Sequence, residues 1–411
     1  MLINDLYLFG EKRGYDTTLL WKEELITNFI DVNEDGSFVL TSNKIGDIVS
    51  VVFEIRTRAD KPNCLWDYID YYQKIEKQEH VERNVRRNKL FWDRAEGVLV
   101  SANDLEALSV IKKLKNCDLT KLKFKTPGRF AIRINGRPVI GRELVRSFLD
   151  REAENGDKGS DICLVSGKPC TAVKCHPEVV IKGFRNSSPL ISFNTDVFKY
   201  KGITQGNNFP ISQTVANAYT KALEDIATDV IALHNGSENR VAVLLWSSED
   251  SKNRDNIRVI LHGKEPGGWR NPDWNFATPI GNIHFLALDV VQSRMPILAY
   301  DVFPESLVIE SLLKFKHHGG RLFENNSITK SIYTTVGWPW DKSSCKISPE
   351  LIVQYFRYAL FGVMYPKALK HKIVQVINND KLNKHYQKGL DKYLDYVSWV
   401  EFFLLTEKES I

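Results

Sequence analysis

Cysteine and histidine side chains that could bind a metal or attack a substrate gather in one short stretch. Cys163, Cys170, Cys175 and His176 lie close together in the chain. Structural zinc sites usually combine two short cysteine pairs set well apart, because each pair spans one edge of a tetrahedron. These spacings are irregular, and Cys175 beside His176 is only a weak signal for a nucleophile and its base. We therefore expect buried thiols and one hydrogen-bonded histidine, with no metal, no cofactor and no catalytic residue.

A second group of histidines offers another enzymatic interpretation. His317 and His318 precede Asn325 and Asn326, a combination that could belong to a metal-dependent nuclease centre. No cluster of carboxylates accompanies them, and the sequence contains no phosphate-binding loop, nucleophile elbow or zinc-protease motif. The sequence thus predicts that the chain is not an enzyme, and a Cys/His or His/Asn metal-dependent nuclease is the last alternative.

Amide and basic side chains dominate the stretch that precedes position 212. Glutamine and asparagine present a donor beside an acceptor, which suits base edges, whereas lysine and arginine bind phosphates. Asparagine side chains also cap the backbone of ordinary loops, and this alternative stays open. The candidate nucleic-acid contacts in this stretch are Lys182, Arg185, Asn186, Asn194, Lys201, Gln205, Asn207 and Asn208.

A further basic pattern lies upstream. Lys121, Lys123 and Lys125 occupy alternate positions, so in an extended strand they project from one face. Arg129 and Arg133 continue the odd-numbered series after a Pro-Gly turn. This face is either a cationic stripe that binds nucleic acid, through Lys123 and Arg129, or the charged solvent face of an ordinary strand.

These side chains must be positioned by a mixture of helices and strands. We expect an α+β fold, an irregular mixed-sheet N-terminal body with inserted helices followed by a short C-terminal helical region. Buried strands are predicted at 241–247 and 283–291, and helices over most of 66–114 and over 212–233. The polar segment 152–160 is the best flexible boundary. This predicts an N-terminal α+β domain (1–155), a central α+β domain (156–345) and a C-terminal helical domain (346–411).

The composition excludes several classes of protein. The 411 residues are 43% hydrophobic and 26% charged, as in ordinary soluble domains, and the formal net charge is only +5. Six cysteines at irregular spacings, without a secretory leader, indicate reduced thiols in the cytoplasm. No stretch approaches the ~20 apolar residues that span a membrane. We expect a cytoplasmic protein with no membrane partner.

The stretch from Cys163 to Leu223 resembles the central signature of one known family. It contains a Cys-x-x-Ser-Gly turn, a His-Pro pair, Ser-Phe-Asn, Gln-Gly-x-Asn-x-Pro and an Ala-x-x-Tyr-Thr-x-Ala-Leu segment, in that order. These motifs are similar to those of the large subunit of type I-C CRISPR Cascade, the Csd-type family. Weaker similarity extends to Lys-Pro-Asn-x-Leu-Trp-Asp near the N-terminus, which adds Lys61, Asn63 and Trp66 as a second candidate nucleic-acid site.

The resemblance implies a role without turnover. The subunit would sit in an RNA-guided surveillance complex, recognise the protospacer-adjacent motif in double-stranded DNA, aid R-loop formation and recruit a helicase-nuclease. Its implied partners are the guide CRISPR RNA, target DNA, and the backbone, guide-end-capping and small subunits. Family members usually continue into a longer C-terminal bundle, so a separate small subunit is expected. The alternative is an architectural subunit that binds guide RNA and its neighbours without reading DNA.

Overall fold

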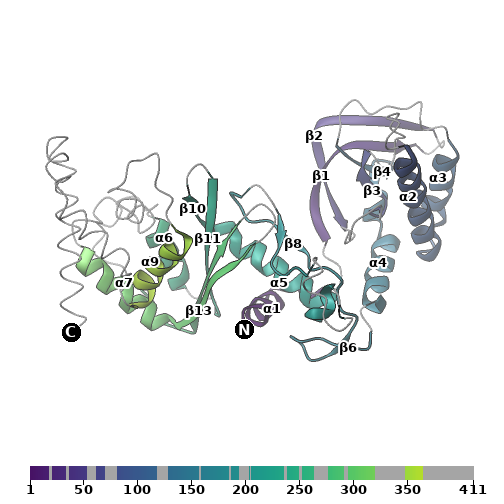
Figure 1. Cartoon of the computed structure of the whole chain (residues 1–411). Helices are drawn as coiled ribbons and strands as arrows, with labels where there is room; N and C mark the ends of the chain where they lie inside the picture. Colours follow the sequence, from purple (N-terminus) through teal and green to yellow (C-terminus); the bar gives the residue numbers. More distant parts are fainter. Residues whose placement is uncertain are drawn as a thin grey trace. The chain divides into compact units, whose positions relative to one another are not determined.

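The computed structural model describes most of the chain in two compact units. The described residues are 1–17, 21–33, 37–52, 62–69, 81–117, 128–156, 159–184, 187–193, 203, 205–235, 238–249, 252–262, 276–290, 295–319 and 348–363. The first unit comprises mainly Ile3–Pro177 and Ile191–Ala222, and the second mainly Glu178–Leu190 and Leu223–Ile411. Helices and sheets occur in both units (Figure 1), which confirms the predicted α+β class. The division into three domains stays a prediction.

A mixed sheet forms the body of the first unit. Its strand order is β2-β1-β4-β3, with β5 paired to β4. β1 is antiparallel to β2 but parallel to β4, so the predicted mixed sheet is confirmed. The strands are β1 (Trp21–Val32), β2 (Phe38–Val52), β3 (Trp66–Tyr68), β4 (Arg129–Ile134) and β5 (Arg137–Pro138).

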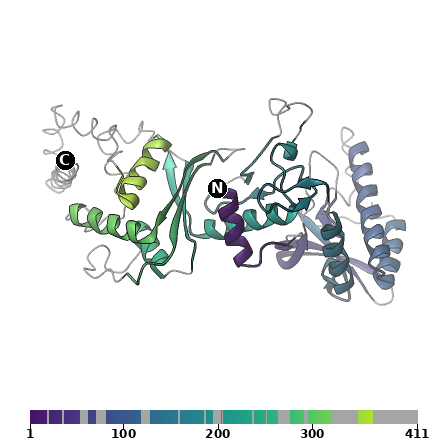
Figure 2. The same cartoon turned by 90° about the horizontal axis from the view of Figure 1, so that it is seen from below.

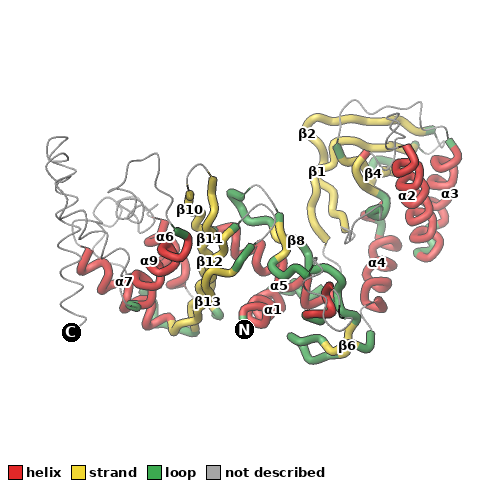
Figure 3. Tube along the Cα trace, in the orientation of Figure 1, coloured by secondary structure: helices red, strands yellow, loops and turns green. Residues whose placement is uncertain are grey.

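Helices lie beside this sheet and share its hydrophobic core. They are α2 (Val81–Ser101), α3 (Leu105–Asn116) and α4 (Glu143–Gly156), with the short η4 (Val139–Gly141) before α4. Figure 3 shows α2 next to β4 and α3 beside α2. Phe29, Phe91 and Phe130 are fully buried in the core. α4 continues through residues 152–156, which were predicted to be a flexible boundary, because the Arg-Glu-Ala-Glu run favours helix.

The rest of the first unit surrounds the family signature. It contains α1 (Leu2–Lys12), β6 (Asp161–Ile162), β7 (Pro169–Cys170), η6 (Gln205–Asn208) and α5 (Gln213–Ile226). A Cβ at Gly10 would lie 2.6 Å from the carbonyl oxygen of Ala218, so α1 and α5 approach closely. The Ser212 hydroxyl accepts the Val215 N–H at 3.1 Å and so caps α5.

The second unit contains an antiparallel sheet covered by helices. The strand order is β10-β11-β12-β13. Figures 1 and 2 show α7 and α9 on one face of this sheet. The strands are β10 (Ile231–Asn235), β11 (Glu238–Ser247), β12 (Asn282–Asp289) and β13 (Ile297–Pro304), and a hairpin pairs β8 (Glu178–Val179) with β9 (Ser188–Pro189). The helices are α6 (Lys252–His262), α7 (Glu305–Gly319) and α9 (Pro349–Phe361).

Two sequence-based helix assignments need correction. The helix expected over 212–233 ends at Ile226, and after η7 (Ala227–Asp229) the chain enters β10, where β-branched Val230 and Ile231 favour extended backbone. Trp66 lies in strand β3 rather than in a helix, because it completes the sheet beside β4. The buried strands predicted at 241–247 and 283–291 correspond to β11 and β12. Among the described helices, none has the length and apolarity to cross a membrane.

Candidate nucleic-acid interface

The amide turn η6 is held against the segment around Val173. The Gly206 N–H donates to the Lys174 carbonyl at 3.0 Å, and the Phe209 N–H donates to the Gly206 carbonyl at 2.8 Å. Gly206 is buried, and a Cβ there would overlap the carbonyl of Val173, so only glycine allows the backbone to come this close. The turn therefore has a fixed position on the first unit.

The three amide side chains of the turn have different environments. Gln205 and Asn207 are exposed, and Gln205 adopts a positive φ of 49°. Asn208 is half-buried, and its amide donates to the Gln205 carbonyl at 2.9 Å. Asn208 thus stabilises the turn itself, which is the capping role considered from the sequence. The exposed Gln205 and Asn207 are accessible to a partner, and their contact with nucleic acid stays a prediction.

Backbone hydrogen bonds anchor the residues that follow the turn. The Leu164 N–H donates to the Pro210 carbonyl at 2.9 Å, and the Val173 N–H donates to the Ile211 carbonyl at 3.1 Å. The signature segment beginning at Cys163 therefore lies alongside the residues that lead into α5. Through this pairing, each of the two segments supplies backbone groups that fix its neighbour.

A buried His176–Tyr219 pair supports the turn from within the unit. His176 Nδ1 lies 2.8 Å from the Tyr219 hydroxyl, and its ring lies 6.2 Å from the ring of Phe209. His176 is 5% exposed, and burial lowers its pKa to about 4, so it is neutral at pH 7. Burial also raises the pKa of Tyr219. The hydrogen-bonded histidine predicted from the sequence is confirmed.

The three cysteines of the signature, Cys163, Cys170 and Cys175, differ in burial. Cys163 and Cys170 are buried, and the Cys163 sulfur accepts the Ser166 N–H at 3.4 Å. Burial raises the pKa of Cys175. Within the described ranges, no group of three or more His, Cys, Asp or Glu side chains converges as a metal site. The side chains of His317 and His318, and residues 325–326, lie outside the described residues.

The upstream candidate Lys182 lies in a different unit. It is exposed in the turn that follows Ile181, between β8 and β9, where Gly183 takes a positive φ of 88°. This hairpin belongs to the second unit, whereas the amide turn belongs to the first. Six other sequence candidates lie outside the described residues: Lys61, Lys123, Arg185, Asn186, Asn194 and Lys201.

The second candidate site consists of side chains that stabilise the sheet. Trp66 is fully buried, and its indole N–H donates to the Val52 carbonyl at 3.0 Å. Asn63 is 2% exposed, and its backbone N–H donates to the Asp67 carboxylate at 2.8 Å. Both side chains are therefore buried, and that of Trp66 belongs to the hydrophobic core of the sheet. The Lys-Pro-Asn-x-Leu-Trp-Asp motif is thus a folding element here.

The arginines of β4 are paired with carboxylates. Arg129 forms an ion pair with Glu24, and it donates to the Tyr68 hydroxyl at 3.1 Å. Arg133 binds both carboxylate oxygens of Asp31, at 2.6 and 2.9 Å. This arrangement supports the interpretation of a charged strand face that is satisfied within the protein, and the cationic stripe does not extend along β4.

Lys174 is a residue that sequence reasoning missed. The residue is exposed, and its backbone carbonyl accepts the N–H of Gly206, so its backbone lies next to the turn that carries Gln205 and Asn207. A lysine whose backbone contacts a turn with two exposed amides is a candidate to add a phosphate-binding group to two base-reading groups. No local pattern marks Lys174, because its place depends on a backbone contact between segments distant in sequence.

Comparison with known proteins agrees with the resemblance seen in the sequence. A family model described as CRISPR-associated protein (Cas_Csd1) matches residues 11–393. The match includes the amide turn, its supporting segment and both sheets. A search of curated proteins found no match.

Proposed function

Because the chain belongs to the Cas_Csd1 family of CRISPR-associated proteins, we propose that it is the large subunit of a type I-C-like RNA-guided complex. In this role it acts in the cytoplasm, without catalysis, and recognises the protospacer-adjacent motif of double-stranded DNA. It then aids duplex opening and R-loop formation, and recruits the helicase-nuclease. Guide RNA, backbone and guide-end-capping subunits and a separate small subunit are its partners.

The observation that carries this proposal is the pair of exposed amides on a rigid turn. Gln205 and Asn207 project from backbone that Gly206 fixes by a hydrogen bond of 3.0 Å to the Lys174 carbonyl. An amide can bond two atoms of one base edge only if its backbone is held in register. A preformed turn avoids the entropy cost of ordering a loop on binding. The turn therefore has the properties required of a short-motif reader.

Lys174 supplies the second part of the proposed contact. Phosphate contacts position a protein on a duplex and make its affinity depend on salt, whereas base contacts carry the specificity. Lys174 is exposed, its backbone contacts the turn, and it makes no ion pair within the described part of the chain. We assign it to a backbone phosphate next to the bases that Gln205 and Asn207 read.

Reading a short motif has an energetic purpose in an RNA-guided complex. Opening duplex DNA costs about 1.4 kcal/mol per stacked base-pair step, and this cost is offset only when the target strand pairs with the guide RNA. Contacts to the flanking motif lower the free energy of the first opened steps. A turn that binds only the correct motif would therefore confine opening to true targets.

A gel-shift assay of the reconstituted complex tests this function. The duplexes differ only in the flanking motif, and the complex carries either the native chain or the Gln205→Ala/Asn207→Ala variant. Each bidentate amide–base contact contributes about 1–3 kcal/mol, so the variant should bind the motif duplex about tenfold more weakly or worse. Asn282→Ala, an exposed amide at the start of β12, is the matched control. Equal motif preference in variant and native complexes would reject the assignment.

An architectural role is the second candidate, and one observation favours it. Asn63 and Trp66, from a motif that resembles one of the family, are both buried, and Trp66 lies in the core of the sheet. If the signature turn serves folding in the same way, its substitution would impair assembly of the complex rather than recognition of the motif. Measuring complex formation alongside the gel shift separates the two roles.

A further inference from the structure

The buried histidine of the signature adjoins both segments that hold the amide turn. His176 follows Lys174 by two residues, and the Lys174 carbonyl accepts the Gly206 N–H at 3.0 Å. The ring of His176 also lies 6.2 Å from the ring of Phe209, whose N–H donates to the Gly206 carbonyl at 2.8 Å. Each of these two backbone bonds of Gly206 thus involves a residue that His176 adjoins, in the chain or by ring packing.

Tyr219 ties this histidine to helix α5. The Tyr219 hydroxyl lies 2.8 Å from Nδ1 of His176, and the two ring centres are 5.9 Å apart. Tyr219 is fully buried, and its neighbour Ala218 lies so close to α1 that a Cβ at Gly10 would be 2.6 Å from the Ala218 carbonyl oxygen. A helix packed this closely has little freedom to shift. The hydroxyl therefore offers a fixed reference point for the segment that holds the turn.

Packing alone does not explain a histidine at this position. Nε2 of His176 is buried and has no hydrogen-bond partner among the residues that the structure describes. A buried nitrogen without a partner destabilises the fold, so an apolar ring of similar size would fill this space more favourably. The atom that distinguishes His176 from such a ring is Nδ1, which forms the hydrogen bond with Tyr219. This bond is therefore the reason to keep a histidine here.

We propose that the His176–Tyr219 hydrogen bond positions the amide turn for motif reading. It fixes the turn relative to α5, so that Gln205 and Asn207 meet the base edges in register. A functional contact of this kind tolerates a displacement of only about 0.5 Å. His176 and Tyr219 are both buried, so neither acts by touching nucleic acid. This role rests on the proposed function of the turn, and it makes recognition depend on one bond inside the protein.

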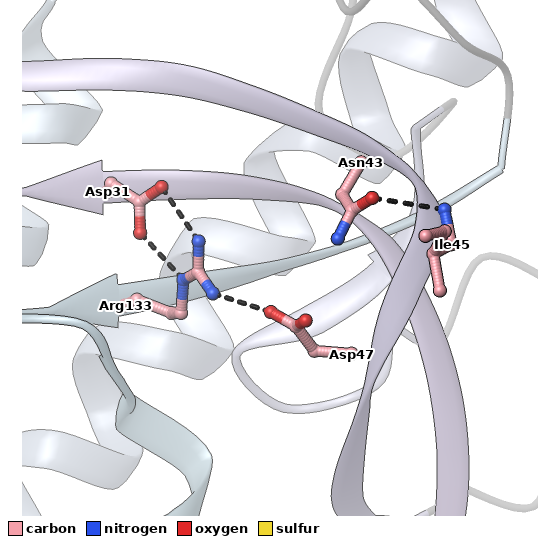
Figure 4. A network of polar contacts seen from close by, with 5 residues as sticks. All are labelled: Asp31, Asn43, Ile45, Asp47 and Arg133. Carbon is pink, nitrogen blue, oxygen red and sulfur yellow. Dashed lines mark hydrogen bonds and ion pairs between the residues drawn. The ribbon is translucent and has the colours of Figure 1, made fainter.

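Three variants separate positioning from stability. Tyr219→Phe removes only the hydroxyl and leaves Nδ1 of His176 unpaired, which destabilises the first unit. The double variant His176→Phe/Tyr219→Phe makes both partners apolar, which restores much of the stability. Arg133→Met is the matched control in the sheet of the same unit, because it removes the hydrogen bonds of 2.6, 2.7 and 2.9 Å from Arg133 to Asp31 and Asp47 (Figure 4). Urea unfolding verifies the fold of each variant and ranks the stabilities.

Hydrogen exchange in the isolated chain measures the turn without nucleic acid. The Gly206 and Phe209 amides should exchange about fivefold faster or more in Tyr219→Phe and in the double variant, because the turn then opens more often. Arg133→Met should leave both rates unchanged at a temperature well below its melting point. Native exchange rates in Tyr219→Phe would overturn the proposal, and so would an equal acceleration by Arg133→Met. If the double variant does not fold, Tyr219→Phe alone decides.

Gel shifts of the reconstituted complex then connect the turn to recognition. Tyr219→Phe and the double variant should lower the preference for the motif duplex about five- to tenfold and leave the affinity for a duplex without the motif unchanged. A double variant that regains both stability and motif preference would reveal a purely structural role and overturn the proposal. A native complex without motif preference would refute the proposed function instead, and the exchange rates alone would then decide whether this bond positions the turn.

Discussion

Replacing Gly206 with alanine should distort the amide turn, because the added methyl group has no room there. The added Cβ would overlap the Val173 carbonyl, so either η6 or the Val173 segment must move. Moving η6 weakens the bond from the Gly206 N–H to the Lys174 carbonyl, now 3.0 Å, a loss of about 1 kcal/mol. Overpacking adds about 1–3 kcal/mol. We therefore expect Gly206→Ala to lower the free energy of unfolding by about 2–4 kcal/mol.

Thermal and urea unfolding measure this effect directly. At about 2–4 °C per kcal/mol for a unit of this size, the melting temperature should fall by about 5–15 °C. Gly97→Ala is the matched control, because Gly97 lies in α2 with no atom within reach of a Cβ, and alanine favours helix. A Gly206→Ala protein that melts like the native chain and keeps motif-dependent binding would refute the idea that a rigid turn presents the amides.

Three further predictions concern buried and exposed charges. The pKa of His176 lies near 4, below its ordinary value of about 6.5, so its contribution to stability is present above pH 6.5 and is lost as the pH falls towards 4. In the native chain this histidine should lower the free energy of unfolding by about 2 kcal/mol between pH 7.5 and 5. His176→Gln should remove this part of the decline, and a pH profile equal to that of the native chain would contradict the prediction. Lys174→Gln should reduce the slope of log affinity against log salt by about 1, whereas Lys112→Gln, on α3, should leave it unchanged. Arg133→Met should destabilise the first unit by about 1–3 kcal/mol, because it leaves Asp31 without its partner; urea midpoints equal to the native value would contradict this.

The sequence predicted secondary structure correctly where the hydrophobic pattern alone determines it. β11 and β12 were predicted because their residues are continuously apolar, as expected of strands buried on both faces. The start of α5 near Ser212 was also predicted, and there the Ser212 side chain makes a local capping hydrogen bond. Local patterns of this kind need no knowledge of distant contacts.

Features that depend on distant pairing could not be found in this way. Trp66 was assigned to a helix and a ligand site, yet its burial depends on β4, which lies far along the chain. Arg129 looked like a free cation, because its partner Glu24 comes from the first strand. Lys174 reaches the amide turn only through a backbone bond to Gly206. Exposure and pairing are tertiary properties, so a list of polar residues overestimates the binding surface.

The most direct test of the central claim compares the purified complex with and without this chain. Gel shifts would use guide RNA and duplexes that differ only in the motif beside the target. We predict that the complete complex binds the motif-bearing duplex about tenfold more tightly or better than the altered duplex, and that this preference disappears without the chain. Equal binding to both duplexes by the complete complex would contradict the account, and would leave the chain with an architectural role.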